Sequence, residues 1–348
     1  MRVARDHLPR AILACAGVAL FVLALEALKS GARGLAPLLA RLEVESLRQA
    51  VGFGWIGAYL VLSGSPVAAI ALSLFSSGVI GDILALGIMT GSRLGASFVV
   101  LFVGFLYHLR GHRRVASIAV GVLAFLVTTS IYVPALILGY VILTNGWFDG
   151  VRFGTPAALE SLIDLASGPV IALLESWLPY WGVFLVGVGI LLGAFRLFDM
   201  VLPQIDAEGS AFGNLANAIY RPWVMFAVGA LFTSVTLSVS VSLTLLVPLA
   251  TRGYIRRENI LPYIMGANIT TFVDTLFASL LLSSPRAFTI VLVEVTAVSF
   301  FSLLILAFGY LPYQRLINRL LQLILADNRS LAIFVLFTVG IPLLLLLV

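Results

Sequence analysis

The chain consists mainly of long apolar runs separated by short charged segments. Such runs cover residues 11–25, 115–143, 287–309 and 331–348. A helix of about 20 apolar residues crosses the hydrocarbon core of a bilayer, whereas a β-barrel would need alternating segments of about ten residues throughout. The pattern therefore predicts an all-α polytopic membrane protein.

One segment alternates instead. Residues 233–244, TSVTLSVSVSLT, carry a hydroxyl at every second position from Ser234 to Thr244. Alternation is typical of a strand, but backbone groups in a bilayer must be satisfied internally unless they line a polar cavity. A helix that unwinds at 238–242 fits both facts, because its arms can turn hydroxyls inward while the link offers backbone groups to a ligand. The alternative is a set of small hydroxyls that hydrogen-bond between packed helices.

A similar pattern occurs earlier in the chain, in a fixed register. When Leu62 is aligned with Leu237, LSGSP (62–66) lies over LSVSV (237–241), and the alignment continues without a gap. Glycine and proline break helices, so a second unwound link is expected at 63–66, and the two links are expected to face each other across a central cavity. This repeat alignment also places the first apolar run over 182–202, which argues against a cleaved signal peptide at the N-terminus.

The distribution of charge predicts the orientation of these segments. The net charge of +5 comes from basic residues between apolar runs, which indicates the positive-inside rule rather than nucleic-acid binding. The basic N-terminus and the loop 108–114 favour the cytoplasm, and the acidic connector 144–180 favours the outside. The two repeats are then inverted, which is typical of secondary transporters with a site near the midplane. A basic, amphipathic surface helix at about 34–49 conflicts with its predicted place outside.

These arguments divide the chain into a first repeat (1–143), a connector (144–181), a second repeat (182–310) and a C-terminal segment with one span (311–348). Each repeat holds three spans and one broken-helix hairpin. In chain order they are span 8–28, hairpin 51–77, spans 83–107, 115–143 and 182–202, hairpin 223–251, and spans 259–283 and 287–310.

Polar residues inside the predicted spans are the candidates for a binding site. Asn268, Thr270 and Thr271 offer oxygens to a hard cation such as Na⁺, or donors to an oxyanion. Asp274 is the single charge in residues 259–285, and acids inside a membrane are costly and usually functional.

Arg93 takes the position of Asn268 in the first repeat, and it could clamp an anion with two hydrogen bonds. The alternatives are an ion pair with Asp274 or a side chain that reaches the membrane surface. Asp82 and Glu294 are weaker candidates, because each could lie at the end of a span or between helices.

At these residues the sequence resembles the sodium/phosphate cotransporter family. That family has two inverted repeats, each with a Gln-Ser-Ser-Ser-type hairpin and a following Gly-Ala/Thr-Asn-Ile-Gly-Thr-Thr-type motif. MGANITTFVDTLFAS (265–279) matches the second motif best, and both hairpins lack the glutamine. The resemblance implies contacts to substrate or Na⁺ from Ser63, Ser65, Ser238, Ser240, Asn268, Thr270 and Thr271.

The sequence thus predicts a transporter, not an enzyme, in a bacterial cytoplasmic membrane with its N-terminus inside. Its expected partners are a small anion such as phosphate, Na⁺ as the coupling ion and the lipid bilayer, with a homodimer possible and no cofactor. The predicted substrate ligands are Ser63, Ser65, Arg93, Ser238, Ser240 and Asn268, and the predicted ion ligands are Thr270, Thr271, Asp274 and Ser242. The alternatives are proton coupling through Asp274, or a non-transporting scaffold or sensor.

The predicted topology can be tested by cysteine labelling. Cys15 is the single cysteine, so one substitution gives a cysteine-free background. A cysteine placed within 108–114 and another placed within 144–180 should react with a membrane-impermeant maleimide from opposite sides. Labelling of both from the same side would contradict the inverted arrangement.

Overall fold

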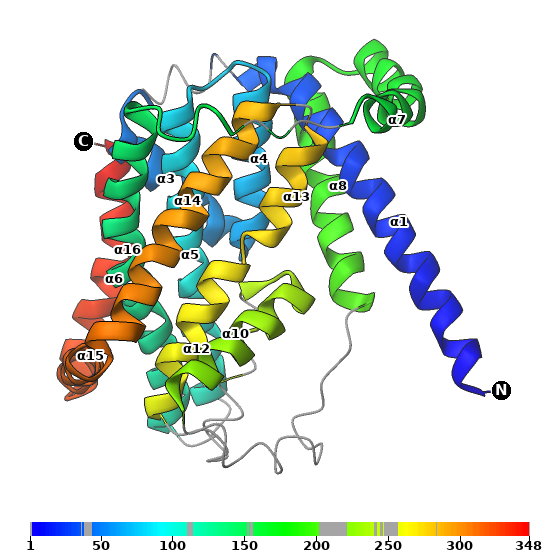
Figure 1. Ribbon diagram of the computed structural model, residues 1–348. Coiled ribbons are helices and arrows are strands. Elements are labelled where there is room, and N and C mark those ends of the chain that lie inside the picture. The colour runs from blue at the N-terminus through cyan, green and yellow to red at the C-terminus, as the bar shows by residue number, and fades with distance from the viewer. Residues whose placement is uncertain are drawn as a thin grey trace.

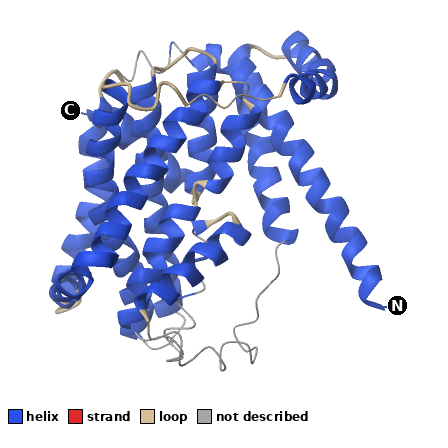
Figure 2. Cartoon of the chain, viewed as in Figure 1, coloured by secondary structure: helices blue, strands red, loops and turns tan. Residues whose placement is uncertain are grey.

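The computed structural model describes residues 2–35, 37, 44–109, 114–151, 153, 156–201, 221–239, 242–243, 246, 257–282 and 284–347. Every regular element in these ranges is helical (Figures 1 and 2). Seven helical stretches among them are long and apolar enough to cross a membrane. The prediction of an all-α, polytopic membrane protein is confirmed.

The helices follow the predicted spans with small shifts. Their bounds are α1 Arg2–Gly31, η1 Ala32–Leu35, α3 Leu47–Val61, α4 Gly64–Ser76, α5 Asp82–Leu109, α6 Arg114–Thr144, α7 Ala157–Trp177, α8 Tyr180–Val201, α10 Pro222–Thr236, α12 Arg257–Thr270, α13 Val273–Leu281, α14 Pro285–Leu304, a π-helical stretch Ile305–Gly309, α15 Tyr310–Ile324 and α16 Asn328–Leu347.

Helix α3 packs beside α5 and runs in the same direction. The glycines of α5 meet successive turns of α3, in the pairs Gly87–Leu47, Gly91–Val51 and Gly95–Trp55. The chain must therefore turn back after α3 to reach the start of α5. It does so through α4, where a Cβ on Gly64 would lie only 2.7 Å from the carbonyl oxygen of Ser92. The tip of this hairpin thus lies at the depth of the middle of α5.

The break at this tip is shorter than the sequence predicts. Ser46 caps α3 together with Gln49, and the helix ends at Leu62 in the left-handed conformation, with φ of 55°. Ser63 is extended. Ser65 and Pro66 were expected in the unwound link, but they lie in the first turn of α4, where a proline costs no hydrogen bond. The prediction of an unwound segment at 63–66 is therefore wrong beyond Ser63.

Helix α10 repeats the geometry of α3 in the register of the repeat alignment. The bounds Leu47–Val61 and Pro222–Thr236 are equivalent, and α10 also ends at a left-handed leucine, Leu237, with φ of 49°. A positive φ is uncommon for a residue with a branched side chain, so its recurrence at equivalent positions is a specific likeness.

The second break is also shorter than predicted. The amide of Ser242 donates to the carbonyl of Ser238 over 3.0 Å, and Val239, Ser242 and Leu243 are helical. The unwound segment expected at 238–242 is therefore wrong at Val239 and Ser242. Ser240 and most of the remaining predicted hairpin to residue 251 lie outside the described residues.

The two halves also share their closest helix crossings. A Cβ on Gly54 would collide with the backbone of Ile88, and a Cβ on Gly229, the aligned glycine of the second half, would collide with the backbone of Tyr263. The crossings are Gly54–Ile88 and Gly91–Val51 in the first half, and Gly229–Tyr263 and Gly266–Phe226 in the second. Small residues at such crossings let helix backbones touch, which is how helices associate in lipid.

Helices α1 and α8 run antiparallel. Gly17 lies against Phe198, whereas Gly31 lies against Phe184, so the residue numbers of one helix rise as those of the other fall. Figure 1 shows the two side by side at the edge of the bundle that carries the N-terminus. In the repeat alignment α8 is the counterpart of α1.

The connector 144–181 contains a helix, α7, that was not predicted. Its apolar side chains recur at helical spacing, and Leu162, Leu165 and Trp177 are exposed by 61–81%. On another side, Glu175 accepts a hydrogen bond from Ser30 of α1. Figure 1 shows α7 at one end of the bundle, with its axis transverse to the long helices. An amphipathic helix with an exposed apolar face suits the membrane surface.

Two other predictions need correction. The surface helix expected at 34–49 is not continuous, because residues 34 and 35 belong to η1, residues 44–46 are not helical and residues 47–49 begin α3. The span 259–283 is interrupted by a turn at Thr271 and Phe272. The predicted span 287–310 covers α14 and the π-helical stretch, and the chain continues directly into α15.

The glycine crossings give a test of the packing. Gly229→Ala should destabilise the protein by about 1–3 kcal/mol, the usual cost of overpacking a tight contact. Gly189→Ala on α8 is the matched control, because a Cβ there meets nothing within 4 Å. Thermal unfolding in detergent should show a lower Tm for the first variant only. Equal Tm values for both would mean that α10 and α12 do not touch in this way.

Candidate functional site

Arg93 of α5 is the centre of a buried polar cluster. The side chain is only 1% exposed. Its Nη1 donates to the hydroxyls of Ser65 (3.3 Å) and Thr271 (3.2 Å), and its Nη2 donates to Thr275 (3.1 Å) and to Oδ1 of Asp274 (3.5 Å). The guanidinium carbon also lies 5.0 Å from the ring centre of Phe272, within the range of a cation–π contact.

These contacts join both halves of the molecule. Ser65 is in the first turn of α4, just after the hairpin tip, whereas Thr271, Asp274 and Thr275 surround the turn between α12 and α13. Figure 1 shows α4, α5 and α13 near one another inside the bundle. The cation of the first half is thus held by oxygens of the second half.

The turn at Thr271 and Phe272 is stabilised from α6. The amide of Phe272 donates to Ile269 rather than to Asn268, four residues back, which leaves the carbonyl of Asn268 without its helical partner. Tyr132 fills the gap, since its hydroxyl donates to that carbonyl over 2.9 Å. The side chain of Asn268 bonds Thr128, also on α6.

The ion pair in this cluster is incomplete. The distance of 3.5 Å between Nη2 of Arg93 and Oδ1 of Asp274 exceeds the roughly 2.7–2.9 Å of a strong charged hydrogen bond. In the described part of the chain, Oδ2 of Asp274 and Nε of Arg93 are buried with no hydrogen-bond partner. The guanidinium is therefore shared among three hydroxyls and one carboxylate rather than committed to the acid.

Glu294 of α14 is a second buried acid. It is 2% exposed, and its Oε1 accepts a hydrogen bond of 2.9 Å from Thr90 of α5. Its Oε2 has no partner among the described residues. Thr90 lies one helical turn before Arg93 on α5, so Glu294 lies beside the Arg93 cluster.

The structure brings together some of the predicted site residues and separates others. Arg93, Ser65, Thr271 and Asp274 form the cluster, and Asn268 is joined to it through the turn. Thr270 is not part of it, because its hydroxyl donates to the carbonyls of Ala230 and Gly266.

Among the other predicted hairpin serines, Ser242 lies outside the cluster. Ser242 bonds Thr233 (2.7 Å) and Tyr263 (2.9 Å), which holds the second hairpin against α12. Ser63 and Ser238 are half-buried at the two breaks, and Ser240 lies outside the described residues.

Several members of the cluster were not predicted. Thr275, Thr90, Thr128 and Tyr132 look like ordinary interface residues in the sequence, and no signal distinguishes them. Glu294 was a weaker candidate from the sequence, and it carries a usable signal because it is the single charge in residues 287–314, the same criterion that selects Asp274.

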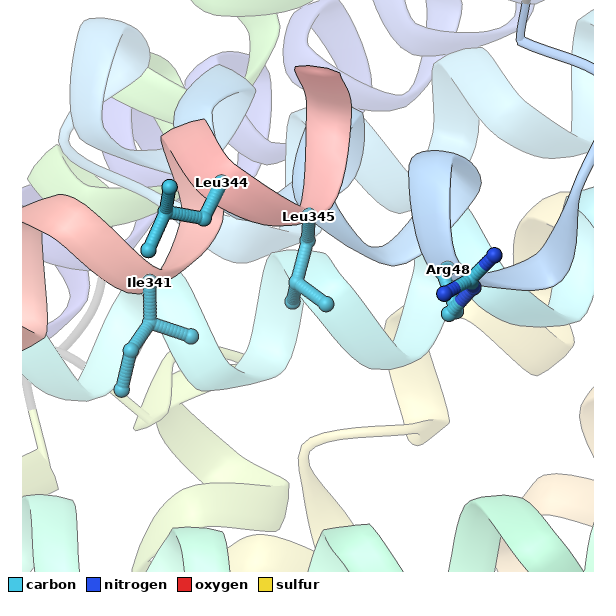
Figure 3. A pocket seen from close by; sticks show the side chains of 4 residues that line it. All are labelled: Arg48, Ile341, Leu344 and Leu345. Carbon is cyan, nitrogen blue, oxygen red and sulfur yellow. The ribbon is translucent and has the colours of Figure 1, made fainter. Parts of the chain in front are cut away.

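A pocket of about 390 Å³ lies elsewhere, between the start of α3 and the end of α16. Its lining residues are Arg48, Ile341, Leu344 and Leu345 (Figure 3). The lining is almost entirely apolar, and Figure 3 shows the three α16 side chains along one stretch of that helix with Arg48 beside them. None of the predicted site residues belongs to it.

Comparison with protein-family models, with curated proteins and with solved structures gave no match. The functional argument therefore rests on the residues and geometry of the chain itself.

Double substitution measures how strongly Arg93 and Asp274 depend on each other. Removing one partner of a buried pair costs about 3–5 kcal/mol because the other charge is left uncompensated. Arg93→Ala and Asp274→Ala should each cause such a loss of unfolding free energy, and the double variant should lose much less than the sum.

The surface pair Arg286–Asp82 is the control. Its nitrogen–oxygen distance is shorter, 3.0 Å, but its side chains are 38% and 31% exposed, so its coupling should be below about 1 kcal/mol. Additive, mild effects at Arg93 and Asp274 would show that the two side chains are not coupled.

Proposed function

We propose that this protein is a secondary active transporter of a small oxyanion, with phosphate as the first candidate and Na⁺ as the coupling ion. The observation that carries the proposal is the Arg93 cluster. A buried guanidinium that donates to oxygens from both halves of the chain is costly in a membrane protein, and a scaffold has no need of it.

The cluster has the chemistry to bind an oxyanion. Arg93 makes only a long contact to Asp274, so an incoming anion could displace that carboxylate and accept the same donors. The hydroxyls of Ser65, Thr271 and Thr275 already lie within hydrogen-bond distance of the guanidinium, and each can rotate to donate to an anion. A phosphate oxygen would then receive both charged and neutral hydrogen bonds.

The shared geometry of the two halves supports alternating access by inverted repeats. Leu62 and Leu237 end equivalent helices, and α1 runs antiparallel to its counterpart α8. In transporters of inverted repeats the site lies where the repeats meet, and one repeat rocks against the other. Arg93 lies at such a meeting point, near the depth of the first hairpin tip.

Sodium is the proposed coupling ion because the cluster offers oxygen ligands without nitrogen or sulfur ligands. Carboxylate, carbonyl and hydroxyl oxygens suit hard cations. Asp274 contributes a buried oxygen without a partner in the described part of the chain, and Asn268 and Thr271 contribute neutral oxygens nearby. Proton coupling through Asp274 is the competing scheme.

Uptake by the purified protein in liposomes tests the proposal. Labelled phosphate should accumulate under an inward Na⁺ gradient and not under a pH gradient alone. Arg93→Ala should lower uptake by about 100-fold, since it removes charged hydrogen bonds of about 1.5–3 kcal/mol each. Arg315→Ala, which changes an exposed arginine of α15, is the control and should retain wild-type uptake. Equal uptake with and without gradients would contradict active transport.

Asp274→Asn separates the two coupling schemes, because it removes the charge and keeps the shape. Under sodium coupling it should raise the Na⁺ concentration needed for half-maximal uptake by about tenfold or more, equal to about 1.4 kcal/mol. If the wild type instead accumulates phosphate on a pH gradient without Na⁺, and the variant loses only that activity, sodium is the wrong ion.

A further inference from the structure

The charges buried around Arg93 do not balance. One arginine faces two acids, Asp274 and Glu294, which gives a formal charge of −1 when both acids are ionised. Tyr132 of α6, whose hydroxyl donates to the carbonyl of Asn268 at the turn, adds no positive charge. Uncompensated charge is costly in the membrane interior, so the cluster calls for one further positive charge.

Most donors of the cluster are already used, and within the described residues the Nε–H of Arg93 is the N–H group of that side chain without a partner. The four hydrogen bonds of Arg93 go to Ser65, Thr271, Thr275 and Asp274, and the hydroxyl of Tyr132 is donated to the carbonyl of Asn268. Thr90 supports Glu294 through Oε1. Within the described ranges, the buried Oε2 of Glu294 and Oδ2 of Asp274 therefore remain as oxygens without a partner.

We propose that Glu294 is a second carboxylate of the transport site, and that a bound Na⁺ balances its charge. The inference rests on the proposed function, because the bound Na⁺ is the coupling ion of that transporter. The unpartnered Oε2 of Glu294 is its charged ligand, with neutral oxygens completing the shell. Thr270, which the sequence predicts as an ion ligand, has a hydroxyl that donates to the backbone of α10, where it joins α12 to that helix.

This assignment gives the ion a structural task. Thr90 and Arg93 belong to α5, Asp274 belongs to α13 and Glu294 belongs to α14. An ion at Glu294 supplies the positive charge that this acid otherwise needs from Arg93, which leaves Arg93 free to exchange Asp274 for an anion. Cation binding would therefore precede and favour anion binding, as symport requires.

The test is the Na⁺ dependence of stability, which needs no transport. The full-length protein in detergent is unfolded by heat in NaCl, KCl or choline chloride at constant ionic strength. A ligand that binds only the folded state raises Tm as its concentration rises, so NaCl should stabilise the wild type and the other salts should not. Glu294→Gln should be at least as stable as the wild type without Na⁺, and its apparent Na⁺ affinity should fall about tenfold or more.

Two further variants keep the test decisive. Glu26→Gln changes a half-buried acid of α1 and should retain the Na⁺ response. If Glu294→Gln does not fold, Glu294→Asp is the second variant, because its shorter side chain keeps the charge but moves the carboxylate away from the ion. An unchanged Na⁺ affinity in Glu294→Asp overturns the inference. A wild type that is stabilised by lower pH and not by Na⁺ also overturns it, since a proton then supplies the positive charge.

The result is separable from the transport experiment. Na⁺-driven phosphate uptake with an unaltered Na⁺ response in Glu294→Gln overturns the role of Glu294 and leaves the transporter standing. A Glu294-dependent Na⁺ response in a protein that transports no phosphate supports the ion site and contradicts the proposed function.

Discussion

The organisation of this protein depends on a buried arginine in the middle of a membrane-spanning helix. A guanidinium has five N–H donors and cannot lose its charge, so lipid-facing side chains cannot surround Arg93. Four of its hydrogen bonds reach side chains of α4, of α13 and of the turn before α13. The hairpin tip and the turn at Thr271 both lie where this side chain needs oxygens, and each supplies hydroxyls there.

Close backbone packing makes this arrangement possible. Helices α3 and α5 touch through glycines, as do α10 and α12. Because these helices pack so closely, the short hairpin of α3 and α4 can reach the depth of Arg93 without leaving a wide gap beside it. The left-handed leucines at the ends of α3 and α10 turn the chain within two residues, so little backbone is left unpaired inside the bundle. Packing by small residues thus allows the polar groups to be buried.

Much of the fold can be predicted from the sequence, and the reasons for the failures are physical. Apolar length predicts the spans well, because lipid imposes it. The turn at Thr271 and Phe272 could not be predicted, since neither residue breaks helices, and the turn depends on Tyr132 and Arg93 from other helices. Helix α7 was missed because its acids lower its hydropathy, although Leu162, Leu165 and Trp177 recur on one face.

The candidate site was predictable where a charge interrupts an apolar run, as at Arg93 and Asp274. It was not predictable for hydroxyls, because a serine or threonine in a membrane helix can bond its own backbone at no cost. Ser242 and Thr270 have the residue types of ligands, yet both hold α10 and α12 together. The resemblance to sodium/phosphate cotransporters selects residue types and cannot tell which hydroxyls are free.

The two halves share the ends of α3 and α10 and the glycine crossings beside them but differ in their buried charges, and this difference has a physical reason. In the repeat alignment Arg93 corresponds to Asn268, Asp274 to Val99 and Glu294 to Ala119. Residues near an axis that relates two halves meet their own counterparts, so a duplicated arginine would face a second arginine in a medium of low dielectric constant. One half therefore carries the cation and the other carries the acids, which lets the halves attract each other across the site. The same asymmetry leaves one acid in excess of the single arginine when both acids are ionised.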